Sequence, residues 1–281
     1  MTGLTVAAAQ VESAYGDIAA NLDTHVRMLR EAAARQVRLV VFPELSLVGH
    51  SAGADALRLA MNRDDRALLE LAQACRELVA VVGFVEEGPG AQFFNSTAAL
   101  SGGRVLHVHR KIALATYGQL DDGKYFGHGG RLDQFRLAAD PRWQVATPIC
   151  ADLWNPALVH RLACDGATLC AAPVSSALEA VGESFDNPRG WDLVLRSHAL
   201  VYGMPFVFAN RIGAEGGLRF WGGSRIIGPR GEIVAQSDDA REALVTGTLE
   251  YAAVRAARFA LPTVRDARAL RDLDGAIVSD T

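Results

Sequence analysis

The chain has 281 residues, of which 50% are hydrophobic and 21% charged, so it can bury a large core and wholesale disorder is excluded. Its 28 basic and 32 acidic residues give a formal charge of −4, which supports neither nucleic acid nor an anionic membrane as a partner. Four cysteines without a C-x-x-C pair argue against a disulfide scaffold or a zinc ribbon. The sequence has no apolar run of ~20 residues and no signal-peptide pattern, so we expect a cytoplasmic protein with reduced thiols.

Strands and helices alternate along the chain. In chain order we expect a strand at 4–10, a helix at 21–35, a strand at 38–44, a helix at 66–78, a strand at 79–85 and a hairpin of strands 95–100 and 104–111. A strand at 143–150, a helix at 156–164, a strand at 167–173, a helix at 191–202, a strand at 205–209, a hairpin of strands 224–227 and 233–236 and a strand at 244–249 follow. Residues 1–281 thus predict one α/β domain with layered sheets, and the Arg- and Ala-rich segment 251–281 is expected to pack on a partner.

Three reactive side chains stand at the ends of apolar strands: Glu44, Lys111 and Cys150. Open α/β folds place their sites at the carboxyl ends of strands. A charge there is costly unless it is paired, so we expect Glu44 to pair with Lys111, and a lysine beside Cys150 to lower the thiol pKa. Lys111 and Lys124 are the only lysines among the 28 basic residues, which suggests a specific need for lysine. The alternatives are an ordinary strand-end carboxylate, a solvated lysine and an inert core thiol.

Other motifs compete with this set. Residues 49–53 match G-x-S-x-G, which would make Ser51 the nucleophile of a serine esterase, but no upstream oxyanion segment accompanies it. Residues 118–124 resemble a P-loop, yet Tyr125 replaces the required Ser or Thr and two aspartates would repel phosphate, so this motif is rejected. His107 and His109 share one strand face without an obvious third metal ligand, and we expect packing or hydrogen-bonding roles for them.

Local sequences around the three strand ends resemble the signature segments of the nitrilase superfamily of carbon–nitrogen hydrolases. These are VVFPELSLVG at 40–49, HVHRKIALATYG at 107–118 and TPICADLWNP at 147–156. Four further segments stand in the family's order, and the resemblance covers nearly the whole chain: VAAAQVE near the start, FFNSTAAL at 93–100, LRSHALVYGMPFVFANRIG at 195–213 and WGGSRIIGPRGEIVA at 221–235. The resemblance implies a four-layer α-β-β-α sandwich that pairs through its helical faces into an eight-layer homodimer, with 251–281 at the interface.

The resemblance also implies a catalytic set of Glu44, Lys111 and Cys150, with no metal or organic cofactor. We expect the backbone N–H of Ala151, next after the nucleophile, to be a second oxyanion donor. The family commonly has a glutamate where this chain has Asp122, one methylene shorter, so its bond to Lys111 or the substrate should be longer or bridged by water. An exposed loop aspartate is the alternative reading of Asp122. Substrate-pocket residues are expected to be Tyr117, Phe126, Trp154 and Ser175.

The expected activity is hydrolysis of a small amide through a thioester on Cys150, releasing ammonia and a carboxylic acid. Trp154, four residues after the cysteine, is similar to the amidase and glutaminase-type branches, and 116–126 resembles the glutaminase domain of NAD synthetases. Three alternatives stay open. The same triad could act on nitriles or N-carbamoyl compounds, Ser51 could serve an esterase, or the chain could be an inactive nitrilase-like binding protein, as the change to Asp122 suggests.

Overall fold

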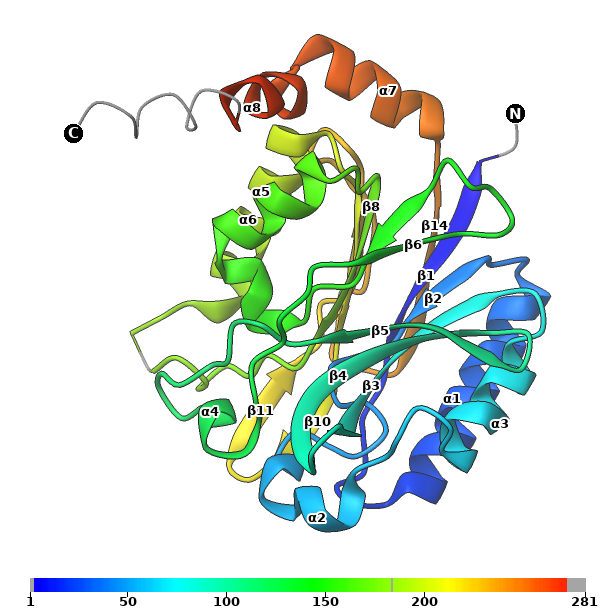
Figure 1. The fold of residues 1–281 in the computed structure, drawn as a ribbon, viewed down its shortest axis with the longest axis vertical. Coiled ribbons are helices and arrows are strands. Elements are labelled where there is room, and N and C mark those ends of the chain that lie inside the picture. Colours follow the sequence, from blue (N-terminus) through cyan, green and yellow to red (C-terminus); the bar gives the residue numbers. More distant parts are fainter. Residues whose placement is uncertain (1–2, 183, 272–281) are drawn as a thin grey trace.

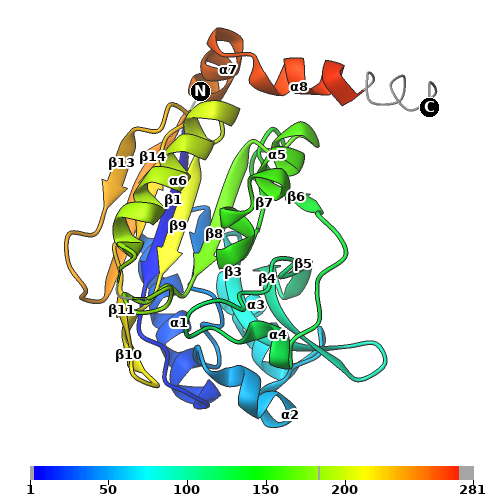
Figure 2. The same cartoon turned by 90° about the vertical axis from the view of Figure 1, so that its left-hand side faces the viewer.

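Two six-stranded sheets pack face to face in the computed structural model, which describes residues 3–182 and 184–271 (Figures 1 and 2). The first sheet, in spatial order, contains β14 (Ala243–Leu249), β1 (Leu4–Gln10), β2 (Leu39–Val41), β3 (Val79–Gly88), β4 (Gln92–Ser101) and β5 (Arg104–Arg110). The second contains β13 (Ile233–Gln236), β12 (Arg225–Ile227), β9 (Phe206–Asn210), β8 (Leu169–Val174), β7 (Gln144–Ala146) and β6 (Gln134–Arg136). A separate hairpin is formed by β10 (Ile212–Glu215) and β11 (Leu218–Trp221).

Helices cover the outer face of each sheet (Figures 1 and 2). The first sheet is covered by α1 (Ile18–Ala34) and α3 (Arg66–Cys75), and the second by α5 (Pro156–Cys164) and α6 (Asn187–Tyr202). Short helices α2 (Ala56–Leu59) and α4 (Asp122–Tyr125) and 3₁₀ turns at Ala52–Asp55 and Cys150–Trp154 lie in loops, and α7 (Tyr251–Ala260) and α8 (Thr263–Arg271) end the described chain.

Strand β1 shows why the layers form. Its side chains alternate, so Val6 and Ala8 pack between the two sheets while Ala7 and Ala9 pack beneath α1. Because both faces are covered, the strand is apolar at nearly every position, as buried parallel-sheet strands are. The same division into one inter-sheet core and two outer cores runs through both sheets, which confirms the predicted four-layer α-β-β-α sandwich.

Two predicted strands are shorter than expected at their carboxyl ends, where Glu44 and Cys150 lie. The segments 38–44 and 143–150 form strands only at Leu39–Val41 and Gln144–Ala146. Pro43 and Pro148 follow, and proline cannot donate to a strand ladder. Glu44 and Cys150 therefore lie in turns beyond the strands. The predicted hairpin at 95–111 is confirmed by the pairing of β4 and β5, whereas the β10–β11 hairpin was not predicted.

The segment expected to pack on a partner forms α7 and α8, which lie beside α5 and α6 of the same chain. Arg258 Nε donates to Tyr202 O at 3.1 Å, and Arg268 Nε donates to Cys164 O at 2.8 Å. Its place at a dimer interface stays a prediction, and residues 272–281 lie outside the described part. Across 3–182 and 184–271, every helix is too short or too polar to cross a bilayer.

Candidate active site

Loops at the carboxyl ends of two strands of the first sheet bring Glu44 and Lys111 into direct contact. Glu44 follows β2, and Lys111 directly follows β5. Lys111 Nζ lies 2.6 Å from Glu44 Oε1, and the two side chains are 2% and 3% exposed. This is the pairing that the sequence predicts for charges at buried strand ends.

Both oxygens of the Glu44 carboxylate are hydrogen-bonded. Asn95 Nδ2, from β4, donates to Oε1 at 2.8 Å, and the Ser175 N–H donates to Oε2 at 3.1 Å. Ser175 directly follows β8, so residues from both sheets fix the orientation of this one carboxylate. A carboxylate held in this way can exchange a proton without moving.

Cys150 begins the 3₁₀ turn after β7, and its φ of +44° is rare for a residue with a side chain. Burial raises the pKa of its thiol, and the neighbouring Glu44 raises it further. The Lys111 charge and a hydrogen bond from the Ser175 N–H lower the pKa but do not offset these effects. Lys111 thus lowers the thiol pKa as expected, but the net pKa is raised because burial and Glu44 outweigh the lysine. To become a thiolate, the thiol needs a base to take its proton, and the Glu44 carboxylate is close enough to raise the thiol pKa.

Asp122, the first residue of α4, is the second anion on Lys111. Its Oδ2 lies 2.6 Å from Lys111 Nζ and also accepts the Ala115 N–H at 3.1 Å. The predicted longer or water-bridged bond is wrong, because the turn of α4 carries the backbone close enough for the shorter side chain to reach. Burial alone would lower the pKa of Lys111, but the negative charges of Asp122, Glu44 and the Cys150 thiolate raise it well above its usual value.

The predicted pocket residues have different surroundings. Ser175 is buried, and its backbone contacts Glu44. Tyr117 is 42% exposed, and burial of its hydroxyl, followed by the nearby Cys150 charge, raises its pKa to about 12. Phe126 is buried at the edge of the outer core of the first sheet and also lines the cavity beside Asp122. Trp154 packs against Trp191, with ring centroids 4.9 Å apart. Ala151 is buried directly after Cys150, and its role as an oxyanion donor stays a prediction.

A small cavity of about 200 Å³ opens beside Asp122. Its lining consists of His50, Ser51, Gly53, Ala54, Gln119, Leu120, Asp121, Asp122, Tyr125, Phe126, Gly216 and Leu218. His50 was missed by the sequence reasoning, although it directly follows the first signature segment. Its Nδ1 lies 3.1 Å from Ser175 Oγ, a contact between residues 125 positions apart. Burial lowers the pKa of His50, which favours the neutral ring.

The competing motifs have other roles in the structure. Ser51 is exposed, and both its N–H and its hydroxyl contact the Glu215 carboxylate rather than a histidine, which a serine nucleophile requires. His109 donates to Asp152 at 3.0 Å, and His107 packs near Phe135. Within the described residues, no three His, Cys, Asp or Glu side chains are grouped as metal ligands.

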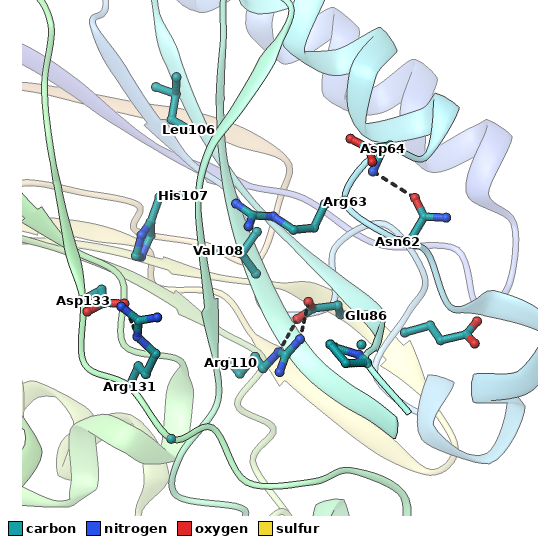
Figure 3. Close-up of a pocket in the computed structure, with 14 residues that line it drawn as sticks. Asn62, Arg63, Asp64, Glu86, Leu106, His107, Val108, Arg110, Arg131 and Asp133 are labelled. Atoms are coloured by element: carbon teal, nitrogen blue, oxygen red, sulfur yellow. Dashed lines mark hydrogen bonds and ion pairs between the residues drawn. The ribbon is translucent and has the colours of Figure 1, made fainter. Parts of the chain in front are cut away.

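A larger cavity of about 610 Å³ lies on another side of β5 (Figure 3). Arg110 and Glu86 pair at its wall, with the Arg110 Nε and Nη2 each 2.8 Å from a Glu86 oxygen. Arg110 ends β5 and lines this cavity, while Lys111, the next residue, turns to Glu44 and Asp122. Glu44, Lys111 and Cys150 line neither this cavity nor the smaller one, but the smaller one reaches the site through Asp122, the partner of Lys111.

Comparison with known proteins identifies the class of enzyme. The sequence model of the carbon-nitrogen hydrolase family matches residues 5–259. The chain is 29% identical over 263 residues to the glutamine-dependent NAD(+) synthetase of Thermotoga maritima, covering 89% of this chain and 42% of that enzyme. It is 27% identical over 267 residues to the N-carbamoylputrescine amidase of Arabidopsis thaliana, covering 90% and 88%. The chain thus spans less than half of the synthetase and most of the plant amidase.

Solved structures show the same fold. An amidase from Nesterenkonia sp. AN1 superposes with a TM-score of 0.80 at 22% identity, covering 97% of both chains; that structure shows covalent addition of the acetamide moiety of fluoroacetamide at its active-site cysteine. The glutamine-dependent NAD+ synthetase of Acinetobacter baumannii has a TM-score of 0.80 at 27% identity, covering 90% of this chain and 46% of that one. The chain belongs to the carbon–nitrogen hydrolase family, in the nitrilase superfamily.

Proposed function

We propose that this protein is an amidase that hydrolyses a short linear amide through a thioester on Cys150. The observation that carries the proposal is the buried contact of Lys111 with Glu44 and Asp122, with the Cys150 thiol close enough to Glu44 and Lys111 for both charges to shift its pKa. A base, a fixed cation and a nucleophile then surround one point, which is the arrangement that acyl transfer requires.

Each proton has a place in this reaction. Glu44 takes the proton of the Cys150 thiol as the sulfur attacks the amide carbon. Glu44 then gives that proton to the nitrogen as the C–N bond breaks, and ammonia or an amine leaves. A water molecule attacks the thioester, Glu44 takes its proton, the C–S bond breaks, and the proton returns to the sulfur. General acid–base help of this kind contributes typically ~10²–10⁴ in rate.

The oxyanion that forms at the amide carbon needs a fixed positive charge. Lys111 supplies an ammonium that two carboxylates keep in place, and the Ala151 N–H supplies a second donor. Loss of one such donor costs about 3–4 kcal/mol of transition-state stabilisation. Asp122 also accepts a hydrogen bond from the Lys111 ammonium and acts by orienting it.

The cavity beside Asp122 supports a neutral or cationic substrate. Its lining contains the exposed carboxylate of Asp121 and the carboxylate of Asp122, which is paired with Lys111, and contains no lysine or arginine. A substrate carboxylate would enter a region of negative charge, whereas an ammonium would be attracted to it. Of the substrates that the relatives' names suggest, a compound with a free amine such as N-carbamoylputrescine fits this lining better than the α-carboxylate of glutamine.

Ammonia release from matched amides tests the proposal. 4-Aminobutanamide should be hydrolysed with a higher kcat/KM than succinic acid monoamide, and Asp121→Asn should narrow that ratio about threefold, as expected for one exposed charge. Cys150→Ala should abolish turnover, and Cys75→Ala, a buried thiol in α3, should leave it unchanged. Turnover by Cys150→Ala would overturn the thioester mechanism. A preference for the carboxylated amide would overturn the substrate assignment alone.

A further inference from the structure

Asp152 is fully buried, and its carboxylate connects the two halves of the site. Oδ1 accepts the N–H groups of Ile112 at 2.9 Å and Ala113 at 2.6 Å, the two residues that follow Lys111. Oδ2 accepts the N–H of Ile149 at 3.0 Å and the Nε2–H of His109 at 3.0 Å. Four donors therefore meet on one carboxylate, and all four lie within two residues of Lys111 or Cys150.

The contacts on the Cys150 side close a small ring. The Asp152 N–H donates to Ile149 O at 2.9 Å, while the Ile149 N–H donates back to the Asp152 carboxylate. Cys150 lies between these two residues with a φ of +44°. A residue with a side chain holds that conformation only when its surroundings fix it on both sides.

The contacts on the Lys111 side come from the other sheet. Ile112 and Ala113 follow β5 in the first sheet, whereas Asp152 follows β7 in the second. His109, 2% exposed in its side chain, points from β5 to the same carboxylate. The two sheets pack through apolar side chains. Such contacts are not directional, so they do not define the position of one strand end relative to another to within a fraction of an ångström. Hydrogen bonds have that directionality.

We infer that Asp152, oriented by His109, is a positioning residue that sets the distance between the Cys150 nucleophile and the Lys111 ammonium; the inference rests on the proposed function. It also aligns the Ala151 N–H, because residue 151 lies inside the same turn. Asparagine has nearly the same shape but only one acceptor oxygen. Its NH₂ group would face the N–H donors that now bond to one of the two Asp152 oxygens, so the hydrogen bonds on that side would be lost and the groups would move apart. A shift of about 1 Å at a reacting group costs on the order of 100-fold in rate.

Asp152→Asn tests this with two readouts. We expect kcat per folded molecule to fall about 100-fold with KM changed less than threefold. We also expect the rate of Cys150 alkylation by iodoacetamide, followed by intact mass, to fall at least tenfold, because activation of the thiol depends on its place beside Glu44. The matched control is Glu86→Gln, another buried carboxylate beside β5, bonded to Ser96 and Arg110 instead of the Cys150 turn. It should lower the melting temperature and leave both rates unchanged.

Each result decides the inference. Wild-type kcat and alkylation rates in folded Asp152→Asn, or equal losses in Glu86→Gln, would overturn it. If Asp152→Asn does not fold, His109→Leu decides: it removes one donor and should slow both reactions about tenfold at unchanged KM. Unchanged rates in that variant would overturn the inference. Alkylation needs no substrate, so a wild-type protein that hydrolyses no amide would contradict the proposed function while the role of Asp152 is still measured.

Discussion

Replacing Lys111 with methionine removes the cation between the buried carboxylate of Glu44 and the partly buried carboxylate of Asp122. Lys111 Nζ lies 2.6 Å from both Glu44 and Asp122, whose side chains are 3% and 17% exposed. Removing one partner of a buried ion pair typically destabilises the fold by about 3–5 kcal/mol. Loss of the oxyanion donor should in addition lower kcat on the order of 10²–10³-fold.

The destabilisation of Lys111→Met should depend on pH. Without the ammonium, one of the two facing carboxylates takes up a proton in the folded state, which then binds more protons than the unfolded state. Stability of the variant therefore rises as pH falls. Urea unfolding followed by tryptophan fluorescence should show a larger deficit relative to wild type at pH 8 than at pH 5.

The chain offers a matched control for this experiment. Lys124, the only other lysine, is exposed, and its ammonium lies 5.0 Å from the Tyr125 ring centroid. Lys124→Met should stay within about 0.5 kcal/mol of wild type, as surface changes usually do. A Lys111→Met deficit of the same size at both pH values, or wild-type kcat in that variant, would refute the reasoning.

Three further predictions concern other parts of the molecule. Burial lowers the pKa of His25 from 6.5 to about 4. Between these pH values the unfolded chain binds more protons than the folded protein. The free energy of unfolding therefore decreases as pH falls through that range, by about 2 kcal/mol at pH 5. Urea unfolding of His25→Gln should show a smaller loss of unfolding free energy between pH 7 and pH 5 than wild type. An equal loss in both proteins would contradict the lowered pKa of His25. Phe259 is 90% exposed on α7. If α7 lies at a dimer interface, the Phe259→Asp variant should elute as a monomer in size-exclusion chromatography. An elution volume equal to that of the wild-type dimer would place the interface elsewhere. Ser51→Ala should keep wild-type ammonia release, and loss of activity would favour a serine mechanism.

The sequence predicts the layers and the meeting of Glu44 with Lys111 for a physical reason. Apolar runs fix which strands are buried, and a charged residue at the end of such a run must find a partner. The two charges follow strands β2 and β5 of one sheet, with β3 and β4 between them, and their opposite signs favour pairing where the loops beyond these strands meet. Their contact at 2.6 Å confirms the pairing, although not the catalytic roles.

Features set by the path of a loop could not be predicted in this way. The direct bond of Asp122 depends on the single turn of α4, which has no periodic pattern to reveal it. The contact of His50 with Ser175 joins loops 125 residues apart. The pKa of Cys150 is raised because the effects of burial and of Glu44 exceed the lowering by the Lys111 charge. The size of each effect depends on distances and burial, which the sequence does not contain. Residue spacing carries none of these quantities.

Intact-protein mass spectrometry after rapid acid quench tests the central claim most directly. Wild-type protein mixed with 4-aminobutanamide should gain the mass of the acyl group, on the peptide that contains Cys150, while ammonia is released. Cys150→Ala should show neither the adduct nor ammonia. Ammonia release at the wild-type rate without an adduct in either protein would contradict covalent catalysis by this cysteine.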